Sequence, residues 1–425
     1  MVTSLLVTMV VTLVLGMPIW ISLMLAVMAG ISLSGLPLLV VTQKVFTSID
    51  SFPLLAIPYF ILAGALMEHG GMSRRLIRLA SALVGSLTGG LAMVSVFSSM
   101  LFGALTGSAP ATTAAIGGIM IKEMEKKGYD SGFSAALMAI SGELGILIPP
   151  SIPAILYAVT VNVSVLDVFM GGIMPGIIFG LALMIIAYII SRKHGYKGEA
   201  RATLGELTGA VKDSFLALLT PVIILGGIYG GIFTPTEAGV VAAVYALLVG
   251  AFFYRELTVQ KIGKIVVQVA ESSATLMLVV AAATVFGWLM VNQGVPQEMS
   301  SAIGKMTDSP YLVLFLFNIL FFVTGFFMNQ GPAILILAPI LVPVVAKLGV
   351  DPTFYGVVMV MVLGLSQVTP PVALSLFVAS RISGRTVEEI VPHLIPFLVG
   401  GIIVAFGLTY LPQVVMLIPN LLTGR

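Results

Sequence analysis

Cysteine is absent from this chain of 425 residues, and charged residues make up only 9% of it. Without cysteine the chain can form no disulfide, no thiolate metal site and no cysteine nucleophile. The 18 acidic and 20 basic residues nearly balance, which excludes the basic surface expected of a nucleic-acid-binding protein. A soluble domain carries about 25% charged residues, so this chain lacks the charge needed to cover a surface exposed to water.

Apolar residues are abundant instead. They make up 59% of the sequence, and the mean hydropathy is +1.14. This composition predicts an all-α polytopic membrane protein in a lipid bilayer, because helices satisfy their own backbone hydrogen bonds in lipid. At about 20 residues per crossing, the length could hold on the order of a dozen membrane segments. Residues 1–37 lack a basic start and a cleavage site, so we interpret them as mature membrane helix and not as a signal peptide.

The basic residues indicate an orientation. Sixteen of them form five clusters, at 74–78, 122–127, 192–212, 255–264 and 381–385. The positive-inside rule places these clusters in the cytoplasm. The membrane crossings then leave all five clusters on the cytoplasmic side only if 88–121 and 311–346 each enter the membrane and return on the same side. With this count of crossings, both termini become periplasmic. Ordinary pairs of spanning helices are the alternative, but the arms are short for a full crossing and meet at polar tips containing Gly and Pro.

The two halves of the chain repeat the same landmarks in the same order. In the first half 106–111 (TGSAPA) is followed by 128–130 (GYD) and Pro149-Pro150. In the second half 328–333 (MNQGPA) is followed by 349–351 (GVD) and Pro370-Pro371, at offsets of 221 or 222 residues. Several matches in order indicate a duplication, with one repeat at 1–213 and the other at 214–425.

The charges also indicate that the second repeat is inverted. The loop at 122–130 contains three Lys residues, whereas its equivalent at 347–351 contains one and falls on the opposite side by parity. Inverted repeats with broken helices are typical of secondary transporters, because the duplication gives two related states that open to opposite sides. We expect static scaffold helices at 1–36 and 214–254, and moving transport elements at about 52–159 and 270–379.

Four breaks in helical pattern lie at equivalent places in the repeats: tips at 106–110 and 328–332, and Pro-Pro breaks at 145–151 and 364–371. Such breaks free backbone carbonyls, which are tolerated in a membrane only where they face protein, water or a ligand. Together with the side-chain oxygens of Thr106, Ser108, Asn329 and Thr369 they suit Na⁺. The helix N-termini that follow suit an anionic substrate. The alternative is that Ser and Thr cap helices and Gly permits close packing.

The ionisable residues at membrane depth are few. Glu143 lies about two turns before Pro149, where it could couple to cation or proton movement or pair with a buried amide. We interpret Glu237 as a helix-capping carboxylate, and we expect structural or interface roles for Glu68, His69 and His393.

No enzyme constellation appears in the sequence. It contains no Walker A motif and no His pair with metal-ligand spacing, so we expect no ATP hydrolysis, no organic cofactor and no enzyme. An intramembrane hydrolase is the runner-up class, but no activated Ser or Asp dyad stands out.

Four motifs resemble one family in order along nearly the whole chain. They are 107–114 (GSAPATTA), 145–151 (GILIPPS), 234–239 (TPTEAG) and 367–371 (QVTPP). The sequence resembles the large membrane subunit of TRAP (tripartite ATP-independent periplasmic) transporters, and within that family it looks most like the sialic-acid branch.

The resemblance implies an elevator-type sodium symporter of the bacterial inner membrane for carboxylates, with sialic acid as the expected substrate. It implies two or more Na⁺ ions, a separate small four-helix membrane subunit and a periplasmic protein that delivers the small anionic substrate. A proton-coupled organic-anion transporter or exchanger is the alternative. The residues implied at the Na⁺ sites are Gly103, Thr106, Ser108, Gly142, Gly145, Pro149, Gly325, Asn329, Gly364 and Thr369. Those implied at the substrate are Ala109, Pro110, Thr112, Ser151, Gly331, Pro332, Gln367 and Pro371.

Overall fold

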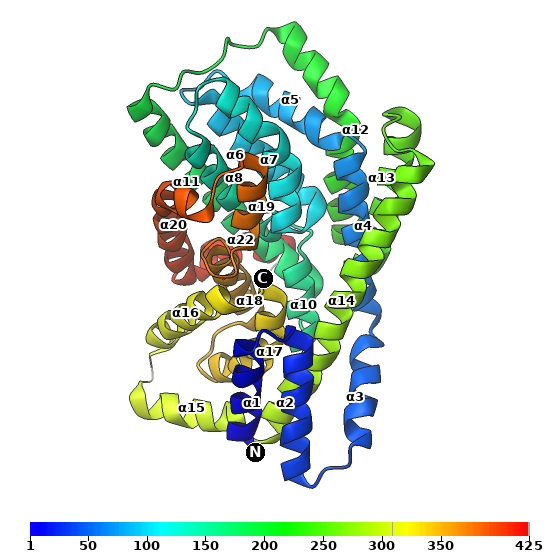
Figure 1. The fold of residues 1–425 in the computed structure, drawn as a ribbon, viewed down its shortest axis with the longest axis vertical. Helices are drawn as coiled ribbons and strands as arrows, with labels where there is room; N and C mark the ends of the chain where they lie inside the picture. Colours follow the sequence, from blue (N-terminus) through cyan, green and yellow to red (C-terminus); the bar gives the residue numbers. More distant parts are fainter. Residues whose placement is uncertain (308, 424–425) are drawn as a thin grey trace.

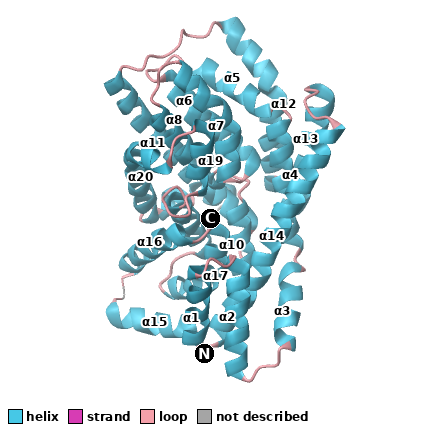
Figure 2. Ribbon diagram, viewed as in Figure 1, coloured by secondary structure: helices cyan, strands magenta, loops and turns pink. Residues whose placement is uncertain are grey.

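The structure is a computed structural model that describes residues 1–307 and 309–423, and the described residues form helices and loops without a strand (Figure 2). Eight of the described helices are long and apolar enough to cross a membrane, or nine if one bent pair counts as a single span. The predicted all-α polytopic fold is confirmed.

The first repeat contains the elements α1 (Val2–Val14), α2 (Ile19–Ser34), α3 (Leu39–Ile49), η1 (Phe52–Leu55), α4 (Ala56–His69), α5 (Met72–Val84), α6 (Gly90–Thr106), α7 (Ala109–Lys126), α8 (Ser131–Gly142), α9 (Leu144–Leu147), α10 (Ile152–Val161) and α11 (Val165–His194). Helices α6 and α7 form the first hairpin, and α8 to α10 form the first broken helix. Its two parts are bent by 41° at the break.

The second repeat contains α12 (Leu204–Tyr229), α13 (Pro235–Leu248), η2 (Val249–Phe253), α14 (Val259–Asn292), α15 (Val295–Met306), α16 (Pro310–Phe327), α17 (Gln330–Lys347), α18 (Pro352–Ser366), α19 (Leu374–Ser383) and α20 (Val387–Thr409). It is followed by α21 (Pro412–Val415) and α22 (Leu417–Thr423). Helices α16 and α17 form the second hairpin, and α18 and α19 form the second broken helix. The element order therefore repeats as the sequence predicted.

Helix starts follow from local capping. Asp130 and Asp351, which are equivalent in the two repeats, each accept a hydrogen bond at 2.8 Å from the backbone N–H three residues later. Thr234 and Glu237 form a capping box at the start of α13, which confirms the predicted role of Glu237. Thr203 and Glu206 form another, so α12 begins at Leu204, ahead of the expected scaffold boundary at 214.

The hairpins and broken helices gather beside a wall of long helices (Figure 1). In that wall α4 packs against α13, and the long α14 packs against α2, α3 and α4. Within the inner group the two repeats cross over. The last part of the first broken helix, α10, contacts α17 of the second hairpin, while α19 of the second broken helix contacts α7 of the first hairpin. The Tyr157 hydroxyl on α10 also donates to the Pro352 carbonyl at 2.6 Å.

Candidate functional site

The first tip, Gly107 and Ser108, joins α6 to α7. Gly107 has a φ of +63°, a left-handed conformation that glycine adopts without steric cost. The Ser108 carbonyl accepts hydrogen bonds from the Thr112 hydroxyl at 2.9 Å and the Thr106 hydroxyl at 3.4 Å. The two threonine hydroxyls lie 2.8 Å apart. The tip therefore concentrates neutral oxygens in a small, largely buried volume.

The first break packs directly on this tip. The Ile152 N–H at the start of α10 donates to the Gly107 carbonyl at 3.2 Å. Two glycines make the approach possible, because a Cβ at Gly103 would lie 3.0 Å from the Gly145 Cα and a Cβ at Gly145 would lie 2.8 Å from the Ser108 carbonyl oxygen. Gly142 also lies close to this tip, since a Cβ added there would lie 2.9 Å from the Ala109 carbonyl oxygen.

The second tip has the same relation to the second break. It joins α16 to α17 through Met328 and the exposed Asn329. The Val372 N–H of the break donates to the Phe326 carbonyl at 3.3 Å, and Gly325 packs against Ser366, whose Cβ would lie 2.6 Å from an added Cβ. The Thr369 hydroxyl donates to the Ser366 carbonyl at 2.5 Å. Each tip thus contacts the broken helix of its own repeat.

A cavity of about 520 Å³ lies between the first tip and the wall. It is lined by the tip residues Thr106, Ser108 and Pro110, by the start of α10, and by α4 and α14. The second tip also faces α10 and α14, because a Cβ at Gly331 would lie 3.4 Å from Leu156 and 3.7 Å from Leu276. Helices α10 and α14 therefore contribute residues near both tips.

The predicted substrate residues occupy different surroundings. Pro110 lines the cavity, whereas Ala109 and Thr112 are buried behind it. Around the second tip Pro332 is buried and Gly331 half-buried. In the second break Pro371 is exposed, and the amide nitrogen of the buried Gln367 has no hydrogen-bond partner among the described residues.

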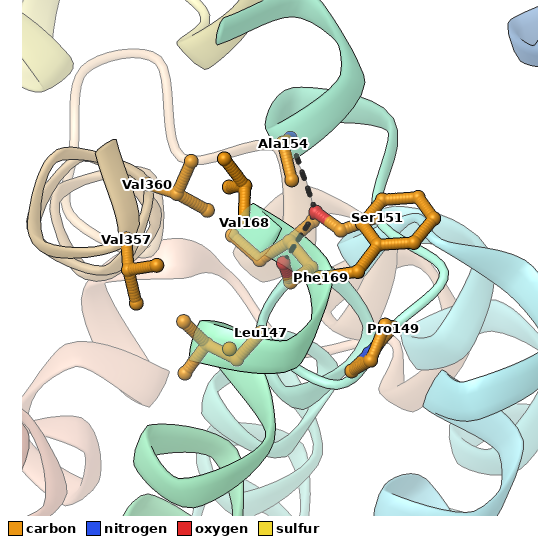
Figure 3. Close-up of a pocket in the computed structure, with 10 residues that line it drawn as sticks. Leu147, Pro149, Ser151, Ala154, Val168, Phe169, Val357 and Val360 are labelled. Atoms are coloured by element: carbon orange, nitrogen blue, oxygen red, sulfur yellow. Dashed lines mark hydrogen bonds between the residues drawn. The ribbon is translucent and has the colours of Figure 1, made fainter. Parts of the chain in front are cut away.

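Ser151 is engaged in the first break itself. Its hydroxyl donates to the Ile146 carbonyl at 2.6 Å and accepts from the Ala154 N–H at 3.3 Å, which caps α10. Beside it lies an apolar space of only about 10 Å³ between the break, α11 and α18 (Figure 3). Val168 and Phe169 of α11 and Val357 and Val360 of α18 line this space. On this side the broken helix is sealed by packing.

The sequence did not place four further residues at the larger cavity: Glu68 and His69 were given structural or interface roles, and Gln268 and Ser272 were not singled out. Glu68 and His69 at the end of α4, and Gln268 and Ser272 on α14, line it together with the tip. The His69 Nδ1 is 3.0 Å from the Ala65 carbonyl oxygen. These side chains lie on regular helices with no break or repeated motif, so only tertiary packing brings them to the tip.

Glu143 lies between α8 and α9, where it is 1% exposed. Its Oε1 accepts a hydrogen bond at 2.7 Å from the Ser375 hydroxyl on α19. The protein partner is therefore a hydroxyl from the other repeat, and not the buried amide considered from the sequence. Its Oε2 has no hydrogen-bond partner among the described residues.

A sequence model described as "Tripartite ATP-independent periplasmic transporter, DctM component" matches residues 6–414. The chain belongs to this family. The resemblance predicted from four motifs is thus confirmed, and relatives in this TRAP family carry the names of transporter permeases and not of enzymes.

Three named relatives illustrate the range of the family. The chain is 45% identical to an isethionate TRAP transporter permease protein of Oleidesulfovibrio alaskensis, covering 95% of this chain and 64% of that protein. It is 40% identical to a C4-dicarboxylate TRAP transporter large permease protein of Pseudomonas aeruginosa, covering 89% and 88%. It is 36% identical to a sialic acid TRAP transporter large permease protein of Vibrio cholerae, covering 96% of each chain.

One solved structure has a similar fold. The crystal structure of the YdaH transporter of Alcanivorax borkumensis, reported to have an unusual topology, matches with a TM-score of 0.60 at 16% identity, over 87% of each chain. This match supports the arrangement of helices described above.

Proposed function

We propose that this TRAP large permease is the Na⁺-coupled subunit that moves a small organic anion across the bacterial inner membrane, with both termini in the periplasm. The observation that carries the proposal is the repeated contact between a hairpin tip and a broken helix. It is made by the Ile152 to Gly107 hydrogen bond in one repeat and by the Val372 to Phe326 hydrogen bond in the other. Two such junctions give two related places for a cation.

The oxygens at these junctions suit Na⁺. The first junction offers the Ser108 carbonyl and the hydroxyls of Thr106 and Thr112, all neutral and within hydrogen-bond distance of one another. The second offers the Ser366 carbonyl and the Thr369 hydroxyl. Neutral oxygens on unwound backbone favour a hard monovalent cation that must be released after each cycle.

The substrate is proposed to bind between the tips. Helices α7 and α17 both begin at a tip and are 18 residues long, so their N-termini present positive dipole ends to an anion. Relatives are named for isethionate, C4-dicarboxylates and sialic acid. Sialic acid, the substrate implied by the family resemblance, should therefore be compared with isethionate and a C4-dicarboxylate in the uptake assay described below.

The same contacts support an elevator movement. Because each tip packs closely on its broken helix at glycine positions, the hairpins and broken helices would move as one block. Helix α4 packs against α13, and α14 packs against α2, α3 and α4 on one side and against α17 of the second hairpin on the other. We propose that both belong to the static wall with α12 and α13, although the sequence led us to expect moving elements at about 52–159 and 270–379.

Two partners complete the proposed assembly. The chain spans 64% of the isethionate permease and 66% of a sialic acid permease from Haemophilus influenzae, so these relatives contain further sequence. We propose that the chain works with a small four-helix permease and with a periplasmic binding protein that delivers the substrate.

Uptake into proteoliposomes with both permeases and the binding protein tests the proposal. We expect uptake to stop when Na⁺ is replaced by K⁺ at a fixed membrane potential, and undiminished uptake would refute Na⁺ coupling. Ser108→Ala and Asn329→Ala should each raise the Na⁺ concentration for half-maximal uptake. Ser32→Ala, an exposed position on α2, is the matched control. Uptake driven by a pH gradient without Na⁺ would favour the proton-coupled alternative.

A further inference from the structure

A buried carboxylate lies where the two repeats meet. Glu143 belongs to the first broken helix, and among the described residues its side chain has one hydrogen-bond partner, Ser375, which stands in the first turn of α19 in the second repeat. The Ser375 side chain is as buried as Glu143, at 1% exposed. The pair is thus enclosed by protein on all sides.

No cation of the described protein neutralises this carboxylate. Every ion pair among the described residues joins other groups. One hydroxyl donor satisfies Oε1 and leaves Oε2 without a partner. A carboxylate removed from water needs a counter-charge or further donors, and the described side chains supply neither at Oε2.

The free oxygen points toward the second break. A Cβ built on Gly364 would lie 3.4 Å from Glu143 Oε2, so the backbone of α18 passes close to it. Gly364 belongs to the second candidate Na⁺ junction, while Gly142 and Gly145 on either side of Glu143 belong to the first. The carboxylate therefore stands at the boundary between the two junctions.

We propose that Glu143 Oε2 and the Ser375 hydroxyl oxygen bind one further Na⁺ ion, in addition to those at the two tips. Carboxylate and hydroxyl oxygens are hard ligands suited to this ion, and an ionisable residue inside a membrane segment is expected to be paired or functional. The Ser375 hydroxyl donates a hydrogen bond to Oε1, and its oxygen keeps lone pairs that can bind a cation. This inference rests on the proposed Na⁺ coupling.

The count of Na⁺ ions per substrate tests the inference. It is obtained in proteoliposomes from the membrane potential at which the Na⁺ and substrate gradients give no net flux. Glu143→Gln keeps the shape and the acceptor for Ser375 but removes the charge. We expect this variant to carry one Na⁺ fewer than the unsubstituted protein. Glu123→Gln, an exposed carboxylate of α7 paired with Lys126, should leave the count unchanged.

Ser375→Ala supplies a second variant in which the carboxylate remains. We expect about a 10-fold increase in the Na⁺ concentration for half-maximal binding, because the ion loses one of its oxygen ligands. Binding of radioactive Na⁺ to the purified protein measures this without transport. If Glu143→Gln transports with an unchanged Na⁺ count, the inference is wrong while Na⁺ coupling stands. The same holds if the variant loses only its response to a pH gradient. An unsubstituted protein that transports without Na⁺ overturns the proposed function itself.

Discussion

At the scale of single residues, the candidate site depends on the absence of side chains as much as on their presence. Gly145 brings the first break within reach of the Ser108 carbonyl, and any Cβ there would enter the space that this oxygen and Thr112 occupy. Gly118 on the adjoining α7 has no atom within 4 Å of a built Cβ. Replacing each of the two glycines by alanine therefore distinguishes the effect of losing the close contact from the effect of changing glycine to alanine in a helix.

We predict that Gly145→Ala lowers stability by about 1–3 kcal/mol, because overpacking forces the tip and the break apart. The same change should raise the Na⁺ concentration needed for half-maximal uptake. Gly118→Ala should leave both quantities nearly unchanged. Thermal unfolding in detergent and Na⁺ titration of uptake measure the two effects, and equal behaviour of the two variants would show that the close contact has no role.

At the scale of elements, each broken helix needs a start as well as an interruption. Ser151 gives α10 its start by capping it, in the position that the sequence assigned to substrate. We predict that Ser151→Ala lowers stability by about 0.5–2 kcal/mol through loss of the cap. Substrate concentration for half-maximal uptake should stay the same. A large rise in that concentration with unchanged stability would instead support the substrate role. Ser164→Ala removes the equivalent cap of α11, away from both tips, and is the control.

The elements also show what the sequence could predict. Pro-Pro pairs and Gly-containing tips interrupt otherwise uniform apolar helices, so both hairpins and both breaks were placed correctly along the chain. The cavity was not predicted, because Glu68 and Gln268 lie on continuous helices and meet the tip only through packing. The hydrogen-bond partner of Glu143 is 232 residues away along the chain, in the other repeat, and no local sequence pattern predicts such a contact.

At the scale of the whole molecule, the distribution of charge predicts sidedness. Single cysteines can replace Lys126, Lys193 and Lys305 directly, because the chain has no native cysteine. We predict that a membrane-impermeant thiol reagent applied from the periplasm labels only the Lys305 replacement. Labelling in permeabilised cells is the control for access. Periplasmic labelling at Lys126 would reverse the proposed orientation.

The proposed movement of the block against the wall is also a property of the whole molecule. Ala111 at the first tip and Ser272 on α14 line the same cavity from opposite sides. We predict that a disulfide between cysteines at these two positions stops uptake and that reduction restores it. Each single cysteine variant should transport normally under the same oxidation. Full uptake after complete crosslinking would favour a gate confined to the hairpins.

The crossed packing of α10 on α17 and of α19 on α7 has a consequence for biosynthesis. During translation α7 and α10 are made long before α19 and α17, the helices of the other repeat that pack on them. The faces of α7 and α10 that these helices cover must therefore wait in the membrane, or at the insertion machinery, until the second half arrives. Each half made alone would leave the faces of this crossed packing uncovered, even though it contains a complete set of helices.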